Sequence, residues 1–78
     1  MSDFSPETIF KNIFQRQSRF ENYKTLEAAV FGEFNCHLRH FSSDFIHRDL
    51  IRWGIHQGLV IHQDGIFIIV NPQEITAR

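Results

Sequence analysis

The sequence lacks the features that mark secreted and membrane-spanning proteins. Cys36 is its only cysteine, so an internal disulfide is impossible and nothing points to an oxidising compartment. It contains no run of about eighteen apolar residues and no charged-then-apolar leader. These absences predict a cytoplasmic protein that has no membrane partner.

The sequence also lacks the usual signatures of enzymes. It has neither a glycine-rich phosphate loop nor a nucleophile elbow. Glu21, Glu27 and Glu33 recur at a spacing that does not bring them to one face of a helix. A chain of 78 residues leaves little room for a substrate pocket of about 300 Å³ or more. We therefore expect a protein that is not an enzyme and needs no cofactor.

Cys36, His37 and His40 are the nearest approach to a metal site. On a helix, Cys36 and His40 would lie one turn apart on the same face. Structural zinc sites usually carry two such paired spacings, and here there is only one. A small buried thiol with surface histidines is the favoured interpretation, and we expect no bound metal.

Aromatic residues and histidines are what the chain has in abundance. Nine Phe, one Trp and one Tyr can fill a dense core, which predicts one domain over residues 1–78. Eight Lys and Arg against nine Asp and Glu give a net charge of −1, so there is no overall basic footprint for nucleic acid. A local basic patch can still act, and four of the five histidines lie between positions 37 and 56.

Local patterns predict an α+β fold of three helices followed by a C-terminal β-hairpin. Ser5 is the expected N-cap of the first helix, which fades after Arg16. Thr25 is the expected cap of the second helix, and Gly32 either interrupts or ends it. Residues 33–41 are compatible with helix, turn or a short strand.

The third helix has the clearest start and stop signals. Ser42 is its expected N-cap, and Asp44 would favour the positive first turn. Gly58 is a natural terminator after the last turn, and Trp53 is expected to anchor the helix in the core. This helix is therefore predicted to begin at Ser42 and to end before Gly58.

The end of the chain predicts a hairpin. Asp64-Gly65 between two extended apolar runs is a strong signal for a two-residue loop, which places Ile61 opposite Ile68. The second run is apolar on both faces, so each face needs a cover from this chain or from a partner. Asn71-Pro72-Gln73-Glu74 predicts the start of another helical turn.

The order of three helices and a hairpin resembles that of winged helix-turn-helix proteins. The run Ile46-His47-Arg48-Asp49-Leu50-Ile51-Arg52-Trp53, followed by Gln57-Gly58-Leu59-Val60, is similar to the recognition helix and wing entry of cyclic-AMP receptor and FNR-like regulators. The resemblance implies a small DNA-binding transcription regulator. Its third helix would enter the major groove of double-stranded DNA, while the hairpin, or wing, touches the flanking backbone.

The third helix carries the candidate nucleic-acid-binding residues. Arg48, Arg52 and His56 recur every fourth residue and form one stripe, to which His47 and Arg39 could add contacts. The alternative interpretation is an ordinary solvated helix face that nearby acidic residues partly neutralise.

The apolar second strand predicts a different function: a protein-protein interaction module that does not bind DNA, such as an adaptor or a small inhibitor of a larger complex. The interface would consist of Ile66, Phe67, Ile68, Ile69 and Val70, and it could also join two copies in a homodimer. The acidic Asp64 at the hairpin tip favours this alternative. A third interpretation is that the strand is buried between the helices and the C-terminal turn.

Overall fold

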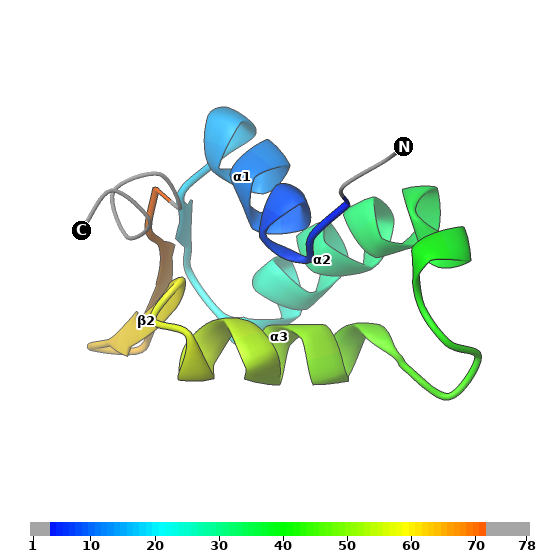
Figure 1. Ribbon diagram of the computed structural model, residues 1–78. Coiled ribbons are helices and arrows are strands. Elements are labelled where there is room, and N and C mark those ends of the chain that lie inside the picture. Colours follow the sequence, from blue (N-terminus) through cyan, green and yellow to red (C-terminus); the bar gives the residue numbers. More distant parts are fainter. Residues whose placement is uncertain (1–3, 72–78) are drawn as a thin grey trace.

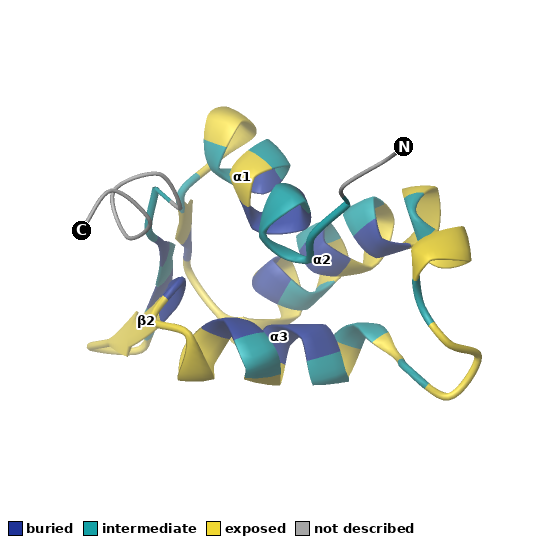
Figure 2. Ribbon diagram, viewed as in Figure 1, coloured by how far each residue is buried: buried dark blue, intermediate teal, exposed yellow. Residues whose placement is uncertain are grey.

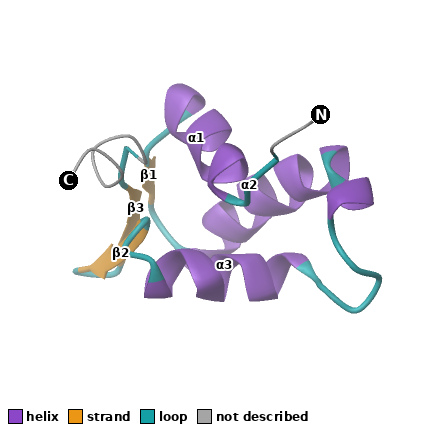
Figure 3. Ribbon diagram, viewed as in Figure 1, coloured by secondary structure: helices purple, strands orange, loops and turns teal. Residues whose placement is uncertain are grey.

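The computed structural model describes residues 4–71. The elements in chain order are α1 (Glu7–Arg16), β1 (Arg19–Phe20), α2 (Tyr23–Cys36), a 3-10 helix η1 (Leu38–His40), α3 (His47–His56), β2 (Val60–Gln63) and β3 (Ile66–Ile69). Figure 1 shows α1 and α2 on the same side of α3, and Figure 3 shows the strands together at one end of the helices. The predicted α+β fold of three helices and a C-terminal hairpin is confirmed.

The hairpin forms as its loop residues require. Asp64 and Gly65 both have positive φ, 53° and 80°, as a type I′ turn demands. The strand pairing places Ile61 opposite Ile68, which confirms the predicted register. Gly58, with a φ of 79°, ends α3 directly before the hairpin, also as predicted. Of the predicted turn at residues 71–74, residues 72–74 lie outside the described residues.

A third strand, β1, was not predicted. Arg19 pairs with Ile68 and Phe20 with Phe67, so the sheet has the antiparallel order β1-β3-β2. β3 is therefore the central strand, and both of its edges are paired within the chain. Two residues are too few to display an alternating pattern, which explains why the sequence gives no signal for β1.

One hydrophobic cluster joins all three helices to the sheet. Its most enclosed large side chains include Phe10, Phe20, Leu26 and Leu50, each at most 1% exposed. Burying a Phe, Leu or Ile side chain stabilises the fold by roughly 1.5–3 kcal/mol. The ring of Phe10 lies against α3 and stacks with Trp53, with their ring centroids 6.1 Å apart. Trp53 is partly buried against the cluster, as expected for an anchor.

α2 starts earlier than predicted, and its end settles which of the open alternatives holds for the residues after Gly32. Its N-cap is Asn22, whose side-chain oxygen accepts a hydrogen bond from the backbone N–H of Thr25 at 2.9 Å. Thr25 therefore lies within the first turn and is not the cap. The helix also continues through Gly32 to Cys36, and η1 follows, so residues 33–41 contain no strand.

α3 begins at His47, and the prediction that Ser42 caps it is wrong. The carboxylate of Asp49 accepts a hydrogen bond from the backbone N–H of Ile46, the N-cap, at 3.1 Å. The residues before Ile46 form a loop because their aromatic rings pack on the body of the domain. Phe41 stacks on Phe45 with centroids 5.1 Å apart and lies 4.8 Å from Phe34. Asp44 lies in this loop and is exposed.

Among the described helices, none combines the length and the apolar character that crossing a lipid bilayer requires.

Candidate nucleic-acid interface

α3 has an inner face in the core and an outer face in solvent. Leu50, Ile51 and Gly54 are buried on the inner face. Arg48, Arg52 and His56 are exposed, as the sequence predicted for the stripe. In Figure 2, the buried part of α3 faces the other helices and the exposed part faces away from them. The stripe is thus a surface feature of a helix whose other side is held by the core.

His47 and Arg48, at the start of α3, share one acidic partner on α2. Oε2 of Glu27 accepts a hydrogen bond from Nε2 of His47 at 2.9 Å and another from Nε of Arg48 at 3.2 Å. The Glu27 side chain is 24% exposed and that of His47 is 19% exposed, whereas that of Arg48 is 65% exposed. His47 is therefore mainly a contact between the two helices, while most of the Arg48 side chain remains in solvent.

The two hydrogen bonds at Glu27 stabilise its ionised form. The bond from His47, followed by the bond from Arg48, holds the pKa of the Glu27 carboxyl below its usual range. Glu27 is therefore a carboxylate at neutral pH, and it places a negative charge beside the basic stripe.

Arg52 sits in a different environment. It has no ion-pair or hydrogen-bond partner within residues 4–71. It borders a shallow hollow of about 170 Å³ between α3 and the start of α2, which Tyr23 and Ile55 also line. This volume is below the roughly 300–1,000 Å³ of typical small-ligand pockets. The hollow is better suited to a contact with a large surface than to enclosure of a small molecule.

The hairpin carries a histidine that packs against an aromatic ring. His62 on β2 stacks on Phe67 of β3 with centroids 4.2 Å apart, and Tyr23 meets the same Phe67 ring at 5.9 Å. His62 is exposed. Phe67 therefore connects the start of α2, through Tyr23, with the other strand of the hairpin, through His62.

Arg39, the fifth predicted contact, lies on η1 and not on α3. It is exposed, and the loop of residues 41–46 separates η1 from α3 in the sequence. Figure 1 shows η1 at the end of the domain away from the sheet. The structure therefore does not join Arg39 to the stripe formed by Arg48, Arg52 and His56.

The predicted protein interface on β3 divides between two faces of the sheet. Phe67 and Ile69 are 8% and 1% exposed and belong to the core, so these two side chains are not available to a partner. Ile66, Ile68 and Val70 are half-buried. Ile61, which pairs with Ile68 on the outer face, is 43% exposed. Any contact through this sheet would therefore use its outer face, which includes Ile61 and Ile68, and not the buried Phe67 and Ile69.

The histidines near Cys36 pack against an aromatic ring. Phe4 stacks on His40 with centroids 4.2 Å apart and on His37 at 5.1 Å. Cys36 is exposed, which contradicts the expectation of a buried thiol. In the part of the chain that the structure describes, no three His, Cys, Asp or Glu side chains are grouped as metal ligands would be.

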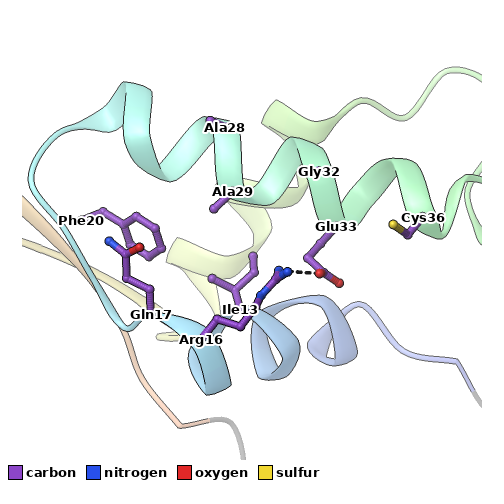
Figure 4. A pocket seen from close by; sticks show the side chains of 9 residues that line it. All are labelled: Ile13, Arg16, Gln17, Phe20, Ala28, Ala29, Gly32, Glu33 and Cys36. Atoms are coloured by element: carbon purple, nitrogen blue, oxygen red, sulfur yellow. Dashed lines mark hydrogen bonds and ion pairs between the residues drawn. The ribbon is translucent and has the colours of Figure 1, made fainter.

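A larger groove lies between α1 and α2. It measures about 470 Å³, which is more room than the chain length led us to expect, and has Ile13 and Phe20 among its lining residues (Figure 4). The ion pair between Arg16 and Glu33 joins its two walls, and both charged groups are satisfied by each other. Within residues 4–71 no buried side-chain polar atom lacks a partner, so no such group awaits a ligand in this groove.

Comparison with protein-family models, with curated proteins and with solved structures finds no match to this chain. Function is therefore inferred from the surface itself. Sequence reasoning identified the stripe but missed Glu27 and Tyr23 as its neighbours. Glu27 and His47 are 20 positions apart in the sequence, so no local pattern indicates their contact.

Proposed function

We propose that the chain is a winged-helix-like module that binds double-stranded DNA through the outer face of α3 and acts as a DNA-binding regulator. The observation that carries this proposal is the exposed stripe of Arg48, Arg52 and His56 on a helix whose inner face is fixed in the core. Arginine is the most common side chain in specific contacts with base edges, and it also binds phosphate well.

The position of α3 supports the proposal. The helix has 10 residues and is therefore about 15 Å long, and an α-helix with its side chains is about 10–12 Å in diameter, which suits a major groove about 12 Å wide. β2 starts only a few residues after α3, and the hairpin lies beside the helix, with β2 packed against it. This order matches what the winged-helix resemblance implies, with the hairpin beside the reading helix.

The charge distribution limits the strength of such binding. The whole chain carries a net charge of −1, and Glu27 lies beside Arg48. Attraction to phosphate is then local to the stripe and is screened at physiological salt. We expect modest affinity for mixed-sequence DNA, with a shallow dependence on salt because few phosphates are contacted.

The test is fluorescence anisotropy with a labelled mixed-sequence duplex at several salt concentrations. Arg48→Ala and Arg52→Ala should each weaken binding. For each phosphate that a variant no longer neutralises, the slope of log affinity against log salt should become shallower by about 0.9. Lys11→Ala is the matched control, because Lys11 is an exposed cation that lies on α1 and not on α3. Unchanged affinity in both arginine variants would contradict the proposal.

Exposed apolar side chains favour a second candidate function, a protein-protein contact. Ile61 is 43% exposed on the outer face of the sheet, and Ile68 lies opposite it. Light scattering distinguishes the two functions when the mass is measured with and without duplex DNA. If the protein partner is a second copy of this chain, the second function predicts no complex with DNA and a mass above that of one chain. Ile61→Asp should lower that mass without unfolding the domain.

A further inference from the structure

Glu27 holds Arg48 by only one of its three nitrogens. The hydrogen bond runs from Nε of Arg48 to Oε2 of Glu27 at 3.2 Å. Within the described residues, the two terminal nitrogens of the guanidinium have no partner. Because an arginine carries five N–H donors in a planar fork, four of them remain for a ligand. The side chain is 65% exposed, so a ligand can reach them.

This arrangement suits a ligand with two neighbouring acceptors. When a carboxylate holds Nε of a guanidinium, the two terminal nitrogens point away from that bond and toward a ligand. The hydrogen bond also restrains the orientation of the guanidinium plane. The major-groove edge of guanine presents two acceptors, O6 and N7, at the spacing that this pair requires. Restraint before binding also reduces the side-chain entropy that is lost on binding.

Arg52 provides the contrast on the same helix. It is exposed one turn after Arg48 and has no ion-pair partner in residues 4–71. An unrestrained arginine adapts to phosphate oxygens in many geometries, which adds affinity but little sequence preference. The two arginines therefore differ in restraint. Arg48 is held by a hydrogen bond, which favours recognition of a base, whereas Arg52 is not held by any described residue, which favours contact with the phosphate backbone.

We propose that Glu27 is a positioning residue that holds Arg48 for two-pronged recognition of a guanine in the major groove, while Arg52 contacts phosphate. This inference rests on the proposed DNA binding. Glu27 also repels phosphate, so it weakens binding to every sequence in which Arg48 finds no guanine. Specificity then comes both from attraction to guanine at the right site and from repulsion at all other sites.

The experiment begins with selection of bound duplexes from a random pool by the wild-type protein. The selected site is then remade with 7-deazaguanine, which lacks the N7 acceptor, at each guanine in turn. For the wild type, one such position should weaken binding by about tenfold. In Glu27→Gln, this discrimination should largely disappear, while affinity for mixed-sequence DNA should rise. A merely structural role of Glu27 would instead lower affinity for both kinds of DNA.

Two further variants complete the test: one removes the planar fork of Arg48, and the other is a matched control for Glu27→Gln. Arg48→Lys retains the charge but lacks the planar fork, so it should lose the same discrimination even if Glu27→Gln is poorly folded. Glu33→Gln is the matched control, because Glu33 is another acidic residue of α2 and pairs with Arg16 on α1. It should leave both affinities unchanged.

The outcomes separate this inference from the proposed function. If the wild type selects no duplex, DNA binding itself is wrong and the inference falls with it. If the wild type binds and Glu27→Gln discriminates against 7-deazaguanine as strongly as before, the positioning role is overturned while DNA binding stands. If Glu27→Gln loses affinity for all DNA equally while circular dichroism shows a folded protein, the positioning role is likewise overturned.

Discussion

Gly32 and Gly54 both lie inside helices, yet their surroundings are opposite. A Cβ atom added to Gly54 in α3 would lie 2.6 Å from Cζ of Phe10, whereas one added to Gly32 in α2 would meet no atom within 4 Å. Gly54 is buried and Gly32 is exposed. The glycine of α3 is therefore a packing requirement, and the glycine of α2 only lowers the stability of its helix.

This difference between the two glycines matters for the candidate interface, because α3 carries the exposed stripe. Because Gly54 lets the ring of Phe10 approach the backbone of α3, the helix lies close to the core, and its outer face is carried on a rigid support. The face of α2 around Gly32 borders the open groove beside α1 instead (Figure 4). A rigid helix is the better support for side chains that must recognise a fixed pattern of acceptors.

The largest expected effect is that of Gly54→Ala. The added methyl group overlaps the Phe10 ring, which is fully buried and has little room to move. Overpacking of this kind costs about 1–3 kcal/mol, and each kcal/mol lowers the melting temperature by about 4–8 °C in a domain of this size. Thermal unfolding followed by circular dichroism measures the change.

A double-mutant cycle tests the cause of that effect. When Phe10→Leu shortens the opposing side chain, the further loss of stability from Gly54→Ala should be much smaller. An equal loss in both backgrounds would show that Phe10 is not what requires a glycine at position 54.

The opposite sign is expected for Gly32→Ala. The site is exposed and inside the helix Tyr23–Cys36, and nothing lies where the new methyl group would go. Alanine should then raise the free energy of unfolding by about 0.5–1 kcal/mol, because it loses less backbone entropy on folding than glycine does. Urea unfolding measures this gain. A loss of stability would instead mean that the added methyl group clashes with a neighbouring atom.

The pair of glycines also shows how far sequence reasoning reaches. The helix patterns and the Asp64-Gly65 loop were predictable because their determinants are neighbours in the chain. The packing requirement at Gly54 comes from the ring of Phe10, which lies 44 positions earlier in the sequence, so no local pattern reveals it. The same holds for β1, whose partner strand is distant in the sequence.

The residues of the candidate interface also fall into those that local patterns predict and those that only the tertiary structure reveals. Periodicity alone placed Arg48 and Arg52 on an exposed stripe, because the helix repeat decides which residues share a face. The start of α3 was misplaced because Ser42 and Asp44 carry a local capping signal that aromatic packing in the loop overrides. The pairing of Glu27 with α3 required the tertiary structure, since it joins two helices.

The smallest expected effect concerns the polar contact between the same two helices. Gly54 serves the apolar packing of α3, which does not depend on pH, whereas Glu27 joins α2 to α3 by hydrogen bonds to its carboxylate. Those bonds hold the folded-state pKa of Glu27 below its usual range. The unfolded chain therefore binds a proton at Glu27 more readily than the folded chain does, and stability from this source rises with pH in the acidic range.

Comparison of the wild type with Glu27→Gln isolates this contribution. The stabilisation is present in full above the unfolded-state pKa of Glu27 and is lost as the pH falls through the lowered folded-state pKa. The melting temperature of the wild type should exceed that of the variant near neutral pH, and the two should converge on acidification at constant ionic strength. The groups that face Glu27 are His47 and Arg48, and both donate to its Oε2 atom. A gap that persists unchanged to strongly acidic pH would mean that the carboxylate form of Glu27 is not what stabilises the contact.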